Sequence, residues 1–156
     1  MSKKLATTGI TAAVYAALTI MLAPISYGPI QMRLSEVMTL LAYVNPAFIP
    51  GLVLGTFLSN INSPMPLPDM VMGTAATWIS VFMMSRTKNV WLASLWPALF
   101  NGVIIGLELY LFAGLPLFLT MGQVALGEFA VVTLIGCPLY FALRSKDGLM
   151  DRLHIK

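Results

Sequence analysis

The chain has 156 residues, of which 58% are hydrophobic and 10% are charged, and its mean hydropathy is +0.86. Soluble domains carry about 25% charged residues, so this composition excludes a soluble globular protein and indicates an integral membrane protein. The net charge of +3 does not indicate a nucleic-acid partner, because the basic residues stand at the ends of apolar segments. We expect an all-α membrane protein that forms one membrane-embedded domain over residues 1–156.

Residue types that carry catalysis or bind metals are scarce. Cys137 is the one cysteine and lies in an apolar run, and His154 is the one histidine and lies in the polar tail. The sequence lacks the GxxxxGK[ST], HExxH and GxSxG motifs of nucleotide-binding proteins and of familiar hydrolases. We therefore predict that the chain is not an enzyme and holds no metal or cofactor of its own.

The first apolar segment covers residues 8–23 and follows Lys3 and Lys4. A signal peptide would have this order of charge and apolarity, but no small-residue cleavage site follows, so we interpret the segment as a membrane span. Two sets of small residues recur every four positions along it: Gly9, Ala13 and Ala17, and Ala12 and Ala16. Such faces let another helix approach closely, either from the same chain or from a separate subunit.

The next apolar stretch is interrupted by Asn45-Pro46, because proline disfavours helix in the residue before it. It forms either two short spans, 34–44 and 47–60, or one bent span over 34–59. The remaining apolar segments cover residues 70–85, 90–113 and 122–143.

The distribution of basic residues distinguishes between six spans, with two short ones, and five spans, with one bent one. With six spans, Arg33 is the single basic residue on one side of the membrane, and the other basic residues lie together on the opposite side. Since cytoplasmic connections are rich in Lys and Arg, we predict six transmembrane helices with both termini cytoplasmic. The outer connections are then residues 25–33, 61–69 and 114–121.

Two of these connections carry informative residues. Pro64, Pro66 and Pro68 alternate in the second connection and predict an extended, stiff backbone, and Asp69 is well placed to cap the helix that follows. In the first connection, Gln31 and Arg33 precede Glu36 at the start of the second span. Either Arg33 reaches the lipid headgroups or this stretch contacts a ligand, and we favour the ligand because polar groups at membrane depth usually serve a function.

Two carboxylates lie within the predicted spans. Glu108 stands about a turn and a half before the outer end of the fifth span, and Glu128 stands at a similar depth in the sixth. Asn101, Ile105 and Glu108 share one helix face. One of the carboxylates could form a structural ion pair with Arg33, but a single cation cannot pair with all of them. The surplus of carboxylate predicts a cationic or donor-rich ligand, with Tyr27, Tyr43, Trp78 and Tyr110 as candidates for stacking.

The runs at residues 11–19, 23–36, 49–55 and 69–77 resemble the QueT family of queuosine-precursor transporters. The resemblance covers nearly the whole chain, and Arg33-Leu34-Ser35-Glu36 is its most specific part. Members of this family are substrate-binding S-components of energy-coupling factor (ECF) transporters, with six helices. The resemblance thus implies a multi-pass protein of the cell membrane.

The resemblance also implies partner subunits. These are a transmembrane coupling subunit and two cytoplasmic ATPase subunits, which use ATP. In S-components an AxxxA pattern in the first helix meets the coupling subunit. Ala12 and Ala16 fit this pattern, and so do Ala13 and Ala17.

The implied ligand is a 7-deazaguanine, such as 7-aminomethyl-7-deazaguanine or its cyano relative. Glu108 is our first choice for accepting the donors of the guanine-like edge, Glu128 is the second, and Asn101 or Gln31 would donate to the ring carbonyl. The remaining predicted substrate-binding residues are Arg33, Glu36, Tyr27 and Trp78. The alternatives are an S-component for another vitamin or nucleobase, and a stand-alone proton-coupled carrier that uses Glu108 and Glu128.

Overall fold

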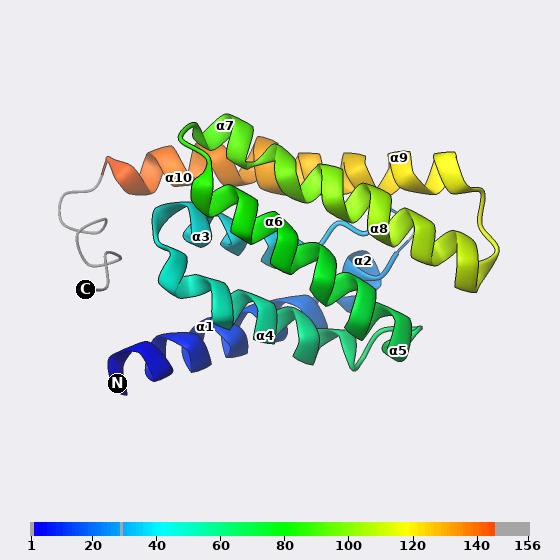
Figure 1. Ribbon diagram of the computed structural model, residues 1–156, viewed down its shortest axis with the longest axis horizontal. Coiled ribbons are helices and arrows are strands. Elements are labelled where there is room, and N and C mark those ends of the chain that lie inside the picture. The colour runs from blue at the N-terminus through cyan, green and yellow to red at the C-terminus, as the bar shows by residue number, and fades with distance from the viewer. Residues whose placement is uncertain (1, 29, 146–156) are drawn as a thin grey trace.

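The computed structural model describes residues 2–28 and 30–145, which form a bundle of helices (Figure 1). Four helices are long and apolar enough to cross a membrane: Lys3–Met21, Pro66–Arg86, Val90–Ala113 and Leu117–Arg144. Two shorter apolar helices are Leu34–Val44 and Pro46–Asn60. No strand occurs within the described ranges, so the predicted all-α membrane class is confirmed.

Several of these helices consist of consecutive elements with different hydrogen-bond patterns. The α-helices are α1 (Ser2–Met21), α2 (Ala23–Ser26), α3 (Leu40–Val44), α4 (Ile49–Asn60), α5 (Pro66–Pro68), α6 (Thr74–Arg86), α7 (Val90–Ala93), α8 (Leu95–Ala113), α9 (Leu117–Glu128) and α10 (Cys137–Arg144). The 3₁₀ segments are η1 (Leu34–Thr39) and η2 (Pro46–Phe48), and the π-helical segments are η3 (Asp69–Gly73) and η4 (Phe129–Gly136).

The predicted break at Asn45-Pro46 is confirmed. The Asn45 side chain accepts a hydrogen bond from the Ala47 amide at 2.9 Å, so it caps the start of the next helix. The start of α1 and the end of α10 lie at the same end of the bundle, together with the connections from α3 to α4 and from α6 to α7 (Figure 1).

Small residues allow α1 and α4 to pack closely. A Cβ atom on Gly51 would lie 2.7 Å from Cβ of Thr11, and one on Gly55 would lie 2.8 Å from Cβ of Tyr15. Ala12 and Ala16 are buried, whereas Gly9, Ala13 and Ala17 are exposed. The two registers of small residues on α1 therefore differ in environment: Ala12 and Ala16 face the bundle, and Gly9, Ala13 and Ala17 lie on the exposed side of the helix.

We expect Gly55→Ala to lower the free energy of unfolding by about 1–3 kcal/mol, because the added methyl overpacks the α1–α4 contact. Gly122→Ala is the matched control, since a Cβ atom there meets nothing within 4 Å. Thermal unfolding in detergent checks both variants. Equal melting temperatures for the two variants would contradict this account of the packing.

The helical hairpin of α8 and α9 corrects the third predicted connection. α8 ends at Ala113 and is capped by Gly114, whose φ of 67° is the left-handed conformation that glycine adopts without strain, and α9 already begins at Leu117. The prediction that residues 114–121 form a connection is therefore wrong from residue 117 onward. As a consequence, Glu128 lies about three turns into its helix, deeper than Glu108, and the predicted similar depth is also wrong.

The proline-rich connection over residues 61–69 also differs from its predicted structure. Pro66 and Pro68 occupy the first turn of a continuous helix, Pro66–Arg86, where the missing proline amide costs no intrahelical hydrogen bond. The predicted extended backbone is therefore wrong at these positions. Asp69 makes no side-chain capping hydrogen bond, and its buried Oδ1 has no partner, so the predicted capping role is also wrong.

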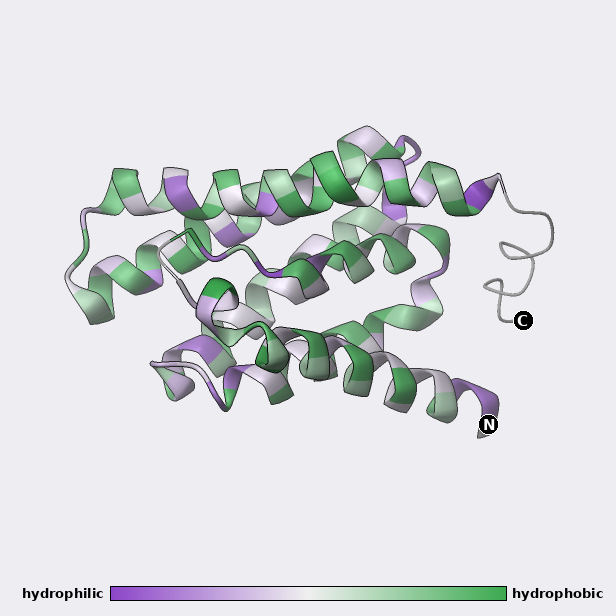
Figure 2. Ribbon diagram, turned by 180° about the vertical axis from the view of Figure 1, so that it is seen from behind, coloured by the Kyte–Doolittle hydropathy of each residue, from purple (hydrophilic) through white to green (hydrophobic). Residues whose placement is uncertain are grey.

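The interior has an apolar part and a polar part. The apolar core includes the following buried side chains: Leu40, Phe48, Leu52, Val81, Met84, Val90, Val131, Val132 and Cys137. Several of these residues flank the connections at the end of the bundle where α1 starts and α10 ends. The buried charged residues lie farther along the bundle, and Figure 2 shows the hydrophilic segment before η1 running between the helices.

Candidate functional site

Five charged side chains from five segments meet inside the bundle. Glu36, Asp69, Glu108 and Glu128 come from η1, η3, α8 and α9, and Arg33 directly precedes η1. Each is at most 5% exposed, and Glu108 is fully buried. We call these five residues the interior cluster. The chain's other two acidic residues, Asp147 and Asp151, lie outside the described residues.

Arg33 is the cation of this cluster. Its guanidinium carbon lies 5.3 Å from the centre of the Tyr27 ring, in a cation–π arrangement. Burial lowers the pKa of Arg33, but Tyr15 and the neighbouring acidic residues outweigh this effect and raise the pKa above its ordinary value. Arg33 therefore carries its charge throughout the accessible pH range.

Many polar atoms of the cluster have no hydrogen-bond partner. The buried atoms without one are Nε and Nη2 of Arg33, Oε2 of Glu36, Oδ1 of Asp69, both carboxylate oxygens of Glu108, and Oε2 of Glu128. Buried polar groups without partners are rare and costly in proteins, and more so when they are charged. These side chains are therefore not satisfied by one another, which disfavours the alternative of a simple structural ion pair.

Two of the carboxylates are held in place through one oxygen each. The Tyr15 phenol donates a hydrogen bond to Oε1 of Glu36, and Asn101 Nδ2 donates to Oε1 of Glu128 at 3.0 Å. The second oxygen of each carboxylate has no partner. The hydrogen bonds to Oε1 fix the orientation of each carboxylate, and the Oε2 atom of each remains available to accept a hydrogen bond from a ligand.

A cavity of about 220 Å³ lies beside the cluster. Its lining includes Tyr27 and Gln31 from the segment before η1, Asp69 from η3 and Leu109 from α8. The Tyr27 phenol donates to the Ser59 carbonyl at 2.5 Å, and burial raises the pKa of this phenol, so it remains a neutral donor. Gln31 has a φ of 49°, an unusual backbone conformation for a residue other than glycine. The cavity thus connects the α2–η1 segment with Asp69.

Comparison with known proteins gives the family. The family model described as QueT transporter matches residues 5–145. The chain belongs to the QueT transporter family. The queuosine precursor transporter QueT of Lactococcus lactis subsp. cremoris is 36% identical over 140 residues, covering 80% of this chain and 82% of that protein. No solved structure matches the chain.

Family membership confirms the resemblance seen in the sequence. QueT proteins are transporters rather than enzymes, in agreement with the prediction from the missing catalytic motifs. Family membership and the several apolar helices together identify the chain as a multi-pass transport protein of the cell membrane.

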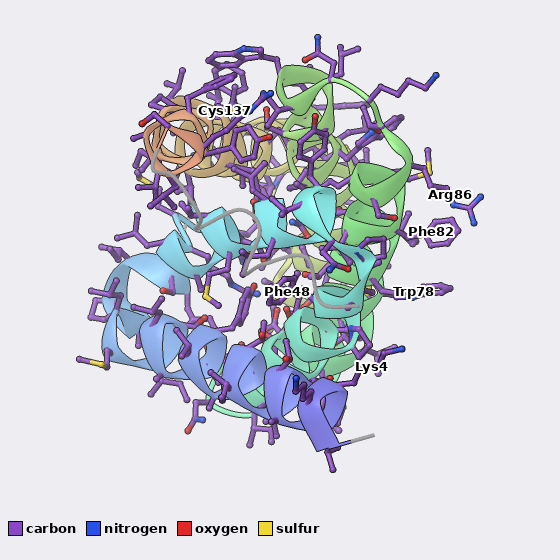
Figure 3. All side chains as sticks on the ribbon, turned by 90° about the vertical axis from the view of Figure 1, so that its left-hand side faces the viewer. Lys4, Phe48, Trp78, Phe82, Arg86 and Cys137 are labelled. Atoms are coloured by element: carbon purple, nitrogen blue, oxygen red, sulfur yellow. The ribbon has the colours of Figure 1, made fainter. Side chains whose placement is uncertain are left out.

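In this QueT chain the predicted site residues fall into three groups. The structure brings Arg33, Glu36, Asn101, Glu108 and Glu128 together in the interior. Gln31 and Tyr27 line the adjoining cavity. Trp78 is 54% exposed and points away from the bundle in Figure 3, so it does not join the others.

Three interior residues are absent from the predicted substrate-binding set: Asp69, Tyr15 and Asn60. The sequence-based prediction assigns Asp69 to a helix cap and also counts it among the surplus carboxylates, whereas no predicted site includes Tyr15 or Asn60. The spacing of Thr11, Tyr15 and Thr19 by four residues is a polar face that could have revealed Tyr15, and all three are buried. No comparable signal marks Asn60, which is fully buried and donates to the Asp69 carbonyl at 2.7 Å.

Proposed function

We propose that this QueT-family protein is the substrate-binding S-component of an ECF-type importer, and that it binds a queuosine precursor, a 7-deazaguanine such as 7-aminomethyl-7-deazaguanine. The observation that carries this proposal is the interior cluster, in which four buried carboxylates face one arginine and retain unpartnered oxygens. Such a site favours a ligand that is rich in hydrogen-bond donors or carries positive charge. The family and the named relative supply the class of substrate.

The guanine-like edge of such a ligand presents a ring N–H and an amino group side by side. Glu128 is the better candidate for accepting them, because Asn101 holds one of its oxygens and the other is buried without a partner. This replaces Glu108 as the first choice for that role. Arg33 has two unpartnered nitrogens, Nε and Nη2, that can donate to the ring carbonyl.

The membrane topology is part of the same proposal. We infer six spans with both termini cytoplasmic, formed by the four long and two shorter apolar helices, in one domain over residues 1–156. The common end of the bundle that holds the start of α1 and the end of α10 supports an even number of crossings (Figure 1). The interior cluster would then open toward the outside.

The exposed face of α1 supports docking of a coupling subunit. Of the two registers, Ala12 and Ala16 face the interior, so Ala13 and Ala17 are our candidates for the partner contact. ATP hydrolysis by two cytoplasmic ATPase subunits would then drive a reorientation of this protein in the membrane, by toppling in the family's mechanism, and release the ligand inside.

We expect Ala17→Trp to reduce ATP-driven uptake at least about tenfold, because a large side chain blocks close helix approach. Equilibrium binding of the ligand should stay within about threefold of the parent, since Ala17 does not touch the interior cluster. Leu18→Trp is the control, at a neighbouring position that is 37% exposed. Equal loss of uptake in both variants would contradict the proposed partner face.

The proposed function is tested by uptake of labelled 7-aminomethyl-7-deazaguanine into vesicles that contain this protein. Uptake is expected when the coupling and ATPase subunits and ATP are present, and little uptake when this protein is alone. Uptake by this protein alone that depends on a proton gradient would instead identify a stand-alone carrier. If the protein neither takes up nor binds 7-aminomethyl-7-deazaguanine, the proposed substrate is wrong.

A further inference from the structure

The four carboxylates of the interior cluster form two neighbouring pairs around Arg33. Glu36 and Glu128 interact with each other, Asp69 and Glu108 interact with each other, and both pairs also interact with Arg33. We propose that Asp69 and Glu108 form a subsite for a primary ammonium group of the substrate, distinct from the Glu128–Asn101 pair that receives the uncharged donors of the ring. This inference rests on the proposed function and deepens it by assigning the charged substituent to named residues.

The unpartnered oxygens of the two carboxylates support a cationic occupant. Both carboxylate oxygens of Glu108 and Oδ1 of Asp69 are buried without a hydrogen-bond partner. Asp69 is 4% exposed, Glu108 is fully buried, and the two side chains are close enough to interact directly. Two adjacent buried carboxylates repel each other when both are ionised, and a cation that binds between them removes this repulsion.

Arg33 does not fill this role within the chain. Its Nε and Nη2 atoms are themselves without partners, and its guanidinium lies over the Tyr27 ring. The Asp69–Glu108 side of the cluster therefore retains unused acceptors next to an arginine that retains unused donors. This is the pattern expected of a site whose ligand supplies both an ammonium group and a carbonyl.

The surroundings of Asp69 hold it in position and add an acceptor. Asn60 Nδ2 donates to the Asp69 carbonyl at 2.7 Å, and Asn60 Oδ1 is another buried acceptor without a partner. Gly73 permits this contact, since a Cβ atom there would lie 2.8 Å from Asn60 Nδ2. A primary ammonium has three donors, so the two carboxylates and the Asn60 amide oxygen provide a matching number of acceptor groups.

The adjoining cavity allows the ammonium substituent of a ligand to reach the subsite formed by Asp69 and Glu108. Asp69 lines the cavity of about 220 Å³, and Leu109, the neighbour of Glu108, lines it from α8. Tyr27 and Gln31 line it from the segment before η1. A bound ligand would thus direct its ammonium toward the cavity and its ring toward Glu128.

Two ligands that share the ring but differ in charge test the proposal. 7-Aminomethyl-7-deazaguanine carries an ammonium at pH 7, whereas 7-cyano-7-deazaguanine is neutral. Calorimetry of the detergent-purified parent should show at least about tenfold tighter binding of the aminomethyl ligand, as expected for charge-assisted hydrogen bonds. Asp69→Asn and Glu108→Gln should each remove most of this preference, with affinity for the cyano ligand kept within about threefold.

Asp147→Asn is the matched control, because it makes the same change from carboxylate to amide in the polar sequence that follows the last predicted span, and it should leave both affinities unchanged. Retained binding of the cyano ligand shows at the same time that each variant is folded. A parent that does not distinguish the two ligands, or variants that keep the preference, would overturn this inference alone. A folded parent that binds neither ligand would contradict the proposed function and the inference with it.

Discussion

Replacement of Glu128 by glutamine is expected to lower the affinity for 7-aminomethyl-7-deazaguanine by at least about 100-fold. Hydrogen bonds to a charged group contribute about 1.5–3 kcal/mol each, and two such bonds to the guanine-like edge account for this loss. Glutamine also directs an NH₂ donor at donors of the ligand, while Asn101 loses its charged acceptor. The measurement is equilibrium binding by calorimetry in detergent.

The control for this variant is Asp147→Asn, which makes the same chemical change in the tail outside the described residues. Thermal unfolding of the ligand-free protein separates a binding defect from a folding defect. A folded Glu128→Gln variant with the affinity of the parent would move the ring-binding role away from the Glu128–Asn101 pair.

Replacement of Arg33 by methionine is expected to destabilise the ligand-free protein by about 3–5 kcal/mol, the cost of leaving buried opposite charges without their partner. Arg33 is 5% exposed and is the one cation among four buried carboxylates. Methionine keeps much of the length of the side chain and removes only the charge and the donors. The measurement is the thermal unfolding transition in detergent, followed by circular dichroism.

A double variant, Arg33→Met with Glu36→Gln, should recover part of the lost stability, because it removes one of the uncompensated charges. The control is Arg86→Met on an exposed side chain that stacks on Phe82, where the loss of a cation–π contact costs at most about 1 kcal/mol. If Arg33→Met and Arg86→Met unfold alike, the interior cluster does not depend on Arg33 for its electrostatic balance.

The broad architecture was predictable because hydropathy and charge act on whole segments. The helix over residues 90–113 was predicted with the observed bounds, since an uninterrupted apolar run needs no knowledge of its neighbours. The Asn45-Pro46 break follows from local backbone chemistry. The inward ridge of Asn101, Ile105 and Glu108 follows from helix periodicity, and all three are buried.

The errors concern helix ends, where the same local sequence is compatible with either a connection or the first turn of a helix. Proline disfavours helix interiors but is tolerated in a first turn, so Pro66 and Pro68 did not reveal by themselves that a helix starts there. Residues 117–121 are mostly apolar and belong to α9, but the sequence prediction begins the last span only at residue 122. Both errors moved helix ends, and the second hid how deep Glu128 lies.

Contacts between distant segments could not be predicted from one sequence. Asp69 is of a residue type that commonly caps helices and stands before a predicted helix, so the sequence alone does not show that it lies next to Glu108 of α8. The two small-residue registers of α1 are alike in sequence, and the packing of Gly51 and Gly55 buries one of them. Trp78 has the chemistry of a stacking residue, but its side of α6 faces outward.

The most direct test of the account is equilibrium binding of 7-aminomethyl-7-deazaguanine to the purified, folded protein without any other subunit, with guanine as competitor. We expect saturable binding of one ligand per chain, with guanine competing weakly because it lacks the ammonium group. Binding of guanine as tightly as the deazaguanine, or no binding of the deazaguanine at all, would contradict the claim that the interior cluster recognises a queuosine precursor.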